Sequence, residues 1–139
     1  MDADIANLKR KVDAGATHLL SQLFFDNDAF FRFLDKARAA GINVPIEAGI
    51  MPCTSKASIE RMVTMCGASL PAKFTRMMAK YQNYPDALKE AGIAYAIDQI
   101  IDLVSRGVDG IHLYTMNSPY VAKRISDAVL PLINPGAAR

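Results

Sequence analysis

The sequence has no tryptophan, only two cysteines and two histidines, and no long apolar run. Cys53 and Cys66 lack the paired spacing of a zinc site, and the sequence has too few histidines to complete a set of zinc ligands. We therefore predict no metal centre. No apolar stretch approaches the roughly 20 residues that cross a bilayer, so we expect no membrane segment. Scarce cysteine is typical of a reducing compartment, and the acidic start Met1-Asp2-Ala3-Asp4 has no apolar signal core. The sequence therefore predicts a cytoplasmic protein without an export signal.

A strong charge of either sign is also absent. The 139 residues include 16 Lys and Arg against 14 Asp and Glu, a formal net charge of +2. This balance argues against a nucleic-acid partner. The basic residues are scattered apart from Lys9-Arg10-Lys11. From the residues alone, this triplet fits a solvated helix face as well as it fits an anion-binding site.

The order of elements indicates an α/β fold. Apolar periodicity and capping residues predict helices over residues 4–14, 28–40, 55–66, 71–81, 85–106 and 118–132 and strands over 18–25, 43–50 and 108–116. Strands that alternate with helices imply parallel crossover connections. The near-continuous apolar character of residues 18–25 suits a strand that is covered on both faces.

Three strands cannot close a barrel. We therefore expect an open three-stranded layer with helices on one side and an opposite, apolar face that needs cover. The fold class is α/β, specifically part of a (β/α)8 TIM barrel, and residues 1–139 form one unit without a linker or an internal repeat. Self-association through the open edges and uncovered face is expected, which predicts a homo-oligomer.

The first predicted helix has two distinct faces. Its apolar residues fall on one stripe, and the side chains off that stripe can reach an anionic ligand: the stripe is Ile5, Leu8 and Val12, and the second group is Asn7, Arg10 and Lys11. Asp2 or Asp4 is the expected N-cap, and Gly15 is the expected C-terminal stop.

Polar and aromatic side chains at strand exits are the candidates for a site, because barrel active sites lie at the carboxyl ends of the strands. They are Gln22, Asp26, Met51, Tyr114 and Asn117. The Gln22 amide can both donate and accept hydrogen bonds, which suits a flat heteroaromatic ring. An equally good interpretation is a buried amide that ties strand ends together.

Other notable residues have simpler interpretations. His112 is expected to be a core histidine with a satisfied partner, and Tyr114 to line a ligand cavity. Four methionines, Met62, Met65, Met77 and Met78, are expected to fill the core. Cys53 lies near the expected pocket rim without a neighbour that would activate its thiol. Glu47, in the second strand, receives no predicted role.

Several segments, in order along the chain, closely resemble the bacterial methylenetetrahydrofolate reductases. They are Asn7-Leu8-Lys9-Arg10-Lys11-Val12-Asp13-Ala14-Gly15-Ala16, Ser21-Gln22-Leu23-Phe24-Phe25-Asp26, Gly49-Ile50-Met51-Pro52, Leu70-Pro71-Ala72 and His112-Leu113-Tyr114-Thr115-Met116-Asn117. The resemblance implies the C-terminal part of a catalytic TIM barrel whose first strands, with the family's catalytic glutamate, lie outside this chain. Any catalytic residue of this chain is therefore unknown.

The resemblance also implies site residues. The positions that match Asp4, Asn7, Arg10 and Lys11 contact FAD, largely along its ribose and diphosphate, and the position of Gln22 contacts the folate. Arg and Lys donate to phosphate oxygens, which agrees with that role. The chain departs from the family at two substrate positions: Ser58 stands where many members have a folate-binding Gln, and Ser118 where many have Arg. Ser118 also fits a helix N-cap.

The implied function is FAD-dependent reduction of 5,10-methylenetetrahydrofolate to 5-methyltetrahydrofolate with NAD(P)H, a step of one-carbon metabolism and methionine biosynthesis. The partners are then the folate substrate and NAD(P)H. Two alternatives stay open. One is a half-barrel that folds and self-associates without turnover, and the other is a different phosphate-binding barrel enzyme that ignores folate.

Overall fold

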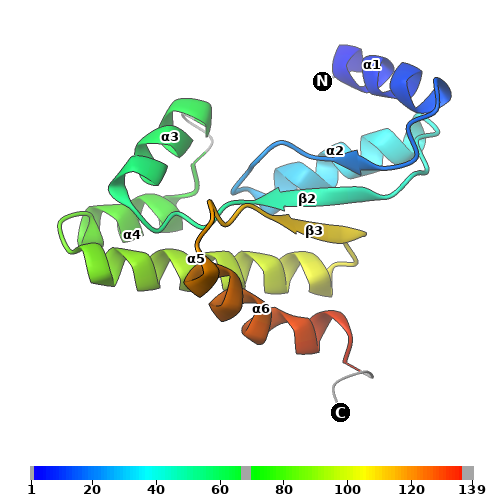
Figure 1. Cartoon of the computed structure of the whole chain (residues 1–139). Coiled ribbons are helices and arrows are strands. Elements are labelled where there is room, and N and C mark those ends of the chain that lie inside the picture. Colours follow the sequence, from blue (N-terminus) through cyan, green and yellow to red (C-terminus); the bar gives the residue numbers. More distant parts are fainter. Residues whose placement is uncertain (1, 67–69, 136–139) are drawn as a thin grey trace.

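The computed structural model describes residues 2–66 and 70–135. Within them, the six helices are α1 (Asp2–Asp13), α2 (Asn27–Ala39), α3 (Lys56–Cys66), α4 (Ala72–Tyr81), α5 (Pro85–Ser105) and α6 (Pro119–Ile133) (Figure 1). The three strands are β1 (Leu19–Leu20), β2 (Ile46–Ile50) and β3 (Gly110–Leu113). The order of elements along the chain confirms the sequence prediction. The predicted end of α3 at Gly67 lies outside the described residues.

The three strands form one parallel sheet in the order β1-β2-β3. Leu19 pairs with Ile46, and Gly49 pairs with His112. Each strand is shorter than predicted, and the prediction of a long first strand over residues 18–25 is wrong. After Ser21 donates to the Glu47 carbonyl (2.9 Å), the chain leaves the ladder, because the Phe25 side chain packs into a separate cluster beyond the strand ends.

The main core lies between the sheet and the helices on one of its faces. Alternate residues of β2, Ile46, Ala48 and Ile50, are at most 1% exposed and pack with residues of α2, α5 and α6. The predicted apolar stripe of α1 also joins this core, with Ile5 buried and Leu8 and Val12 partly buried. This arrangement confirms one helix-covered face of a parallel α/β sheet.

A second core lies beyond the carboxyl ends of the strands, where α3 and α4 sit (Figure 1). It is built around Phe25, Cys53, Met62, Phe74 and Leu88. The Phe25 and Phe74 rings stack with 4.2 Å between their centroids. The long helix α5 contributes to both cores and so joins the strand-exit region to the sheet. Met62 is core, as predicted.

The face of the sheet opposite the helices is mixed, which corrects in part the expectation of an apolar face: Leu20, the register partner of Glu47, is 44% exposed there, and charged and polar side chains lie beside it. Glu47 points to this side between two histidines: its carboxylate lies 3.0 Å from His18 Nε2 and 3.8 Å from His112 Nδ1. His112 has its partner, but 46% of its side chain is exposed, so its assignment to the core is also wrong. The alternation of side chains along β3 places His112 on this open face, away from the helix-covered core.

The predicted helix ends are mostly confirmed. Gly15, Gly41 and Gly107 have φ values of +122°, +87° and +86°, a conformation that suits glycine after a helix. Asp2 and Asp4 lie inside the first turn of α1, so neither is its N-cap. No helix in the described part of the chain is long and apolar enough to cross a membrane.

Candidate ligand site at the strand exits

A cavity of about 640 Å³ lies beside β1 and the segment that follows it. Its lining brings together Asp4 of α1, Gln22 and Asp26 after β1, and Met65 of α3. Asp4 and Gln22 are predicted from different motifs, one for a cofactor and one for a substrate. The tertiary structure places both on the wall of one cavity.

The predicted cofactor residues follow one another along the exposed side of α1. Asn7, Arg10 and Lys11 are all exposed, and the Arg10 guanidinium donates to the Asn7 side-chain oxygen. Lys9, the third member of the basic triplet, instead forms an ion pair of 2.7 Å with Asp13. Of the three basic side chains, Arg10 and Lys11 are therefore the ones without a carboxylate partner among the described residues.

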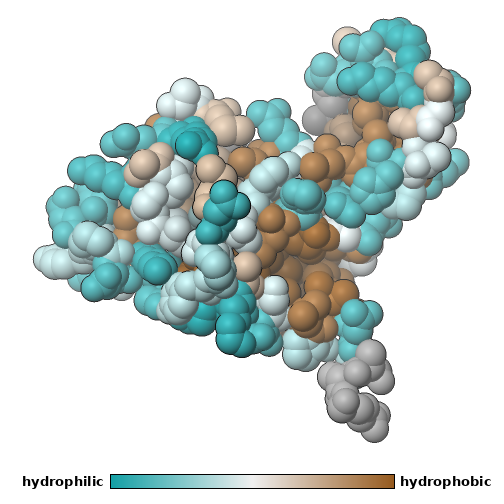
Figure 2. Space-filling model, in the orientation of Figure 1, coloured by the Kyte–Doolittle hydropathy of each residue, from teal (hydrophilic) through white to brown (hydrophobic). Residues whose placement is uncertain are grey.

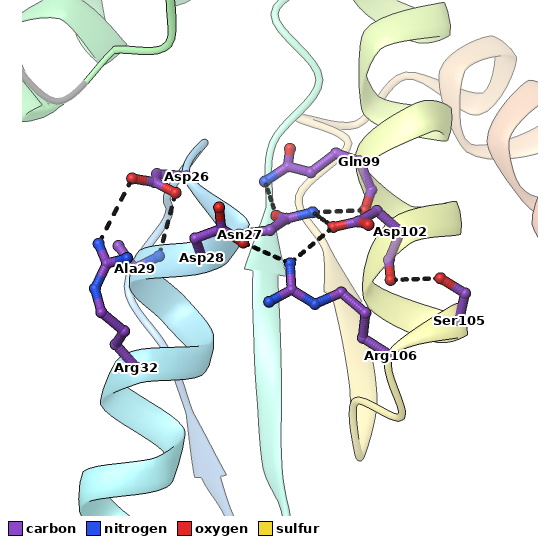
Figure 3. Close-up of polar contacts among 9 residues, drawn as sticks. All are labelled: Asp26, Asn27, Asp28, Ala29, Arg32, Gln99, Asp102, Ser105 and Arg106. Atoms are coloured by element: carbon purple, nitrogen blue, oxygen red, sulfur yellow. Dashed lines mark hydrogen bonds and ion pairs between the residues drawn. The ribbon is translucent and has the colours of Figure 1, made fainter.

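A polar clamp holds the segment that carries Gln22. Gln99 of α5, only 6% exposed, donates through its amide nitrogen to the Phe24 carbonyl (3.0 Å). The same nitrogen donates to the Asn27 side-chain oxygen (3.2 Å) (Figure 3). Asn27 in turn donates to Asp102 (2.8 Å). Asp26, a predicted site residue, instead caps α2 by accepting from the Ala29 backbone N–H. The clamp therefore fixes where the segment leaves β1, while Gln22 itself stays exposed.

Arg106, at the end of α5, makes the contacts next to this clamp. Its guanidinium contacts Asp28 (2.8 Å) and Asp102 (3.3 Å) and lies 4.1 Å from the Phe31 ring centroid. The hydrogen bond to Asp28 is the main cause that raises the pKa of Arg106 above its usual range. These contacts join the starts of α2 and the end of α5 (Figure 3).

The segment after β3 has an unusual backbone. Tyr114 is half-buried and donates from its backbone N–H to the Ile50 carbonyl (2.8 Å). Met116 and Asn117 then both have positive φ, +52° and +61°. Such a conformation is uncommon for residues other than glycine and concentrates at functional sites. Ser118 caps α6 by accepting from the Val121 backbone N–H (3.3 Å).

Gly49 lets these segments approach one another. A Cβ atom at this position would lie 2.8 Å from the Ser21 carbonyl oxygen and 3.4 Å from a Tyr114 ring carbon. The Gly49 backbone N–H donates to the Ser21 hydroxyl (2.9 Å). Of the other predicted strand-exit residues, Met51 is 3% exposed and belongs to the second core.

Ser58 lies in the first turn of α3. Its hydroxyl donates to the Ser55 carbonyl (2.8 Å), and its backbone N–H donates to the Ser55 hydroxyl (3.2 Å), as in a capped helix start. Both predicted serines are therefore used in helix caps. The structure does not show either one lining the cavity beside β1.

Sequence reasoning missed the carboxylate on the open sheet face. Glu47 of β2 contacts His18, which immediately precedes β1, and His112 of β3, and a Cβ atom at Gly110 would lie 3.1 Å from Glu47 Cγ. The sequence predicts strands through all three residues, but the strand pairing that brings the two histidines to Glu47 is not a local signal. No group of three or more His, Cys, Asp or Glu side chains in residues 2–66 and 70–135 is arranged to hold a metal ion.

A cavity at the exit of a parallel strand, walled by Asp4 and Leu8 of the preceding helix and by the Gln22 amide, offers hydrogen-bonding groups and an apolar wall to a ligand with a flat ring. Arg10 and Lys11, on the exposed side of that helix, and Tyr114, after β3, do not line this cavity. The parallel sheet and its helices define the class, part of a (β/α)8 barrel, and the cavity lies at the carboxyl end of β1, where such barrels keep their ligand sites.

The sequence comparisons give the family. The family profile described as methylenetetrahydrofolate reductase matches residues 1–129, and the chain belongs to this family. It is 38% identical over 115 residues to methylenetetrahydrofolate reductase (NADH) 1 of Arabidopsis thaliana, a match that covers 83% of this chain and 19% of that protein. It is 37% and 36% identical, each over 115 residues, to the 5,10-methylenetetrahydrofolate reductases of Pectobacterium carotovorum subsp. carotovorum and Escherichia coli (strain K12).

Those two matches cover 83% of this chain and 39% of each bacterial protein. The chain thus spans about two fifths of the bacterial relatives and about one fifth of the plant relative. Relatives of both kinds carry the name of the same reductase. The resemblance that the motifs indicated is confirmed.

Proposed function

We propose that the chain supplies the C-terminal strands and helices of a methylenetetrahydrofolate reductase barrel. The complete barrel would reduce 5,10-methylenetetrahydrofolate to 5-methyltetrahydrofolate, with FAD as the cofactor and NAD(P)H as the electron source. The observation that carries this proposal is the single cavity lined by both Asp4 and Gln22. Hydride transfer requires the cofactor ring and the substrate ring to lie next to each other, so residues proposed to contact each of them should line the same cavity.

The residues of this chain have separate roles in the proposal. Arg10 and Lys11 donate to the FAD diphosphate, and Asp4 and Asn7 contact the ribose and its surroundings. Gln22 orients the folate pterin ring through its amide. Tyr114, beside Gly49, closes the substrate side. FAD when bound supplies the hydride chemistry, whereas these side chains place the rings and balance the charge.

The electron donor belongs to the same proposal. The Arabidopsis relative is named for NADH, and we extend the use of a reduced nicotinamide to this chain without choosing between NADH and NADPH. The protein is proposed to work in the cytoplasm, with residues 1–139 as part of one barrel domain.

Flavin retention tests the cofactor assignment. The purified chain is mixed with FAD and desalted, and bound flavin is measured by absorbance and mass analysis. Arg10→Ala combined with Lys11→Ala should reduce retained FAD about tenfold or more, because two charged hydrogen bonds to phosphate are removed. Added salt should weaken binding further in each single variant.

Lys9→Ala is the matched control, because Lys9 lies in the same basic triplet but is paired with Asp13. It should leave FAD retention unchanged. Equal retention by the double variant and the unaltered chain would contradict the diphosphate site. A chain that retains no FAD at all would favour the alternative, a half-barrel without turnover.

A further inference from the structure

One arginine near the strand exits has no carboxylate partner among the described residues. Arg61 of α3 is exposed, and its only described polar contact joins Nη1 to the Met116 sulfur at 4.0 Å. Most arginines around the site differ in this respect: Arg106 contacts Asp28 and Asp102, and Arg124 contacts Glu90 (2.7 Å). A thioether is a weak acceptor that does not neutralise a guanidinium.

The position of Arg61 links two elements of the candidate site. Residues three apart on a helix share a face, so Arg61 lies one turn beyond Ser58 on the same side of α3. Met65, one turn further along that side, lines the cavity that also contains Gln22. Helix α3 lies beyond the carboxyl ends of the strands, where a barrel ligand enters (Figure 1).

The other side of Arg61 faces the segment after β3. Met116 is 61% exposed, and it and Asn117 have positive φ. This backbone presents the Met116 side chain to Arg61 and ends at Ser118, whose hydroxyl is used in the cap of α6. Ser118 has no charge, whereas the Arg61 guanidinium of α3 lies beside the segment after β3 through its contact with Met116.

We propose that Arg61 binds a carboxylate of the glutamate tail of the folate substrate. This inference rests on the proposed function and adds to it the group that selects the charged tail. A folate has a flat pterin at one end and carboxylates at the other, so Gln22 and Arg61 would hold opposite ends of the ligand. A guanidinium suits a carboxylate because its two N–H groups match the two oxygens.

Two ligands that differ only in the tail test the inference. The chain is titrated with pteroylglutamate and with pteroate, which lacks the glutamate, and the ligand fluorescence is followed without interference because the sequence has no tryptophan. The unaltered chain should bind pteroylglutamate about fivefold more tightly than pteroate, as expected for one solvent-accessible charged hydrogen bond. Arg61→Gln should abolish this preference and leave the affinity for pteroate unchanged.

Arg61→Lys and Arg76→Gln complete the set of variants. The lysine variant keeps the charge and should retain part of the preference. Arg76, an exposed arginine of α4 without an ion pair among the described residues, is the matched control, and its glutamine variant should behave like the unaltered chain. A preference that survives in Arg61→Gln, or a loss that is equal for both ligands, would overturn the role of Arg61 alone.

The remaining outcomes separate this inference from the proposed function. If neither ligand binds the unaltered chain, the folate function of the chain is contradicted, and the inference falls with it. If Arg61→Gln weakens binding of NADH or NADPH while the preference for pteroylglutamate persists, the anion at Arg61 is a phosphate and the carboxylate assignment is wrong.

Discussion

A single carbon atom added at Gly92 would collide with the backbone of another element. A Cβ atom at this position in α5 would lie 1.9 Å from the Cys53 carbonyl oxygen and 2.7 Å from the carbonyl carbon. The glycine is therefore what lets α5 contact the chain that follows β2. This contact places the second core, and with it α3, against the strand exits.

Gly92→Ala should destabilise the fold by about 1–3 kcal/mol, the usual cost of overpacking. The higher helix propensity of alanine, worth about 1 kcal/mol, offsets only part of this cost. Urea unfolding measures the difference. Ala94→Leu, at an exposed position of the same helix, is the control and should change stability little. An unchanged unfolding midpoint in Gly92→Ala would show that α5 can move away from Cys53 freely.

At the scale of elements, α5 and α6 are joined by an exposed polar cluster. Glu90 of α5 accepts hydrogen bonds from Tyr120 and from Arg124 (2.7 Å) of α6, and the Lys89 ammonium lies 4.3 Å from the Tyr120 ring centroid. The hydrogen bond from Tyr120, followed by that from Arg124, lowers the pKa of Glu90 below its ordinary value of 4.5. The folded state therefore favours the ionised carboxylate.

The sign of this shift predicts a pH dependence. Stability contributed by Glu90 is present above its ordinary pKa and is lost as the pH falls through the lowered, folded-state value. Glu90→Gln should lower the thermal midpoint at neutral pH, and the difference from the unaltered chain should shrink in acid. Glu60→Gln, at an exposed glutamate of α3, is the control. A difference that stays constant from neutral to acidic pH would rule out the charge as its cause.

The clamp around Gln99 shows how elements position a site residue. Neither Gln99 nor Asn27 belongs to a recognisable motif, yet Gln99 bonds both Asn27 and the Phe24 carbonyl across more than 70 positions in sequence. The clamp fixes the exit of β1, and Gln22 precedes it by two residues. A buried amide whose nitrogen donates to two acceptors specifies one arrangement of its neighbours.

At the scale of the whole molecule, the sheet formed by residues 2–66 and 70–135 has two unpaired edges, at β1 and at β3. Figure 2 shows apolar surface between α1 and the strands and also beside the C-terminal half of α6. Leu20 on the edge strand β1 is 44% exposed, and Leu130, Leu132 and Ile133 of α6 are 54%, 46% and 41% exposed. Open edges with apolar neighbours favour association with another chain.

We expect the purified chain to self-associate as its concentration rises, and light scattering after size exclusion measures this. Leu20→Lys should weaken association, because a charge on an edge strand opposes pairing. Tyr84→Lys, which removes a 64% exposed side chain outside both edges, is the control. A stable monomer at high concentration would contradict this prediction. We also expect no reductase turnover by these 139 residues alone, because the family resemblance identifies no catalytic residue among them.

The sequence by itself determined the order of the elements, the helix-covered face of the sheet and the family. Local signals were sufficient for these. Gly15, Gly41 and Gly107 follow helices and have the positive φ that glycine tolerates best, and the apolar stripe of α1 packs against the main core as its spacing predicts. The family motifs could be recognised from the sequence because each one is a contiguous segment of the chain.

Only the tertiary structure decided how long the strands are, what the open face carries and which motifs meet. Residues 21–25 have the composition of a strand, but the chain leaves the sheet after Ser21 and the Phe25 side chain packs into the second core. Glu47 contacts His18, just before β1, and His112 of β3, and Asp4 and Gln22 line the same cavity. Strand pairing and cavity walls depend on contacts between residues far apart in the chain, which local sequence patterns do not encode.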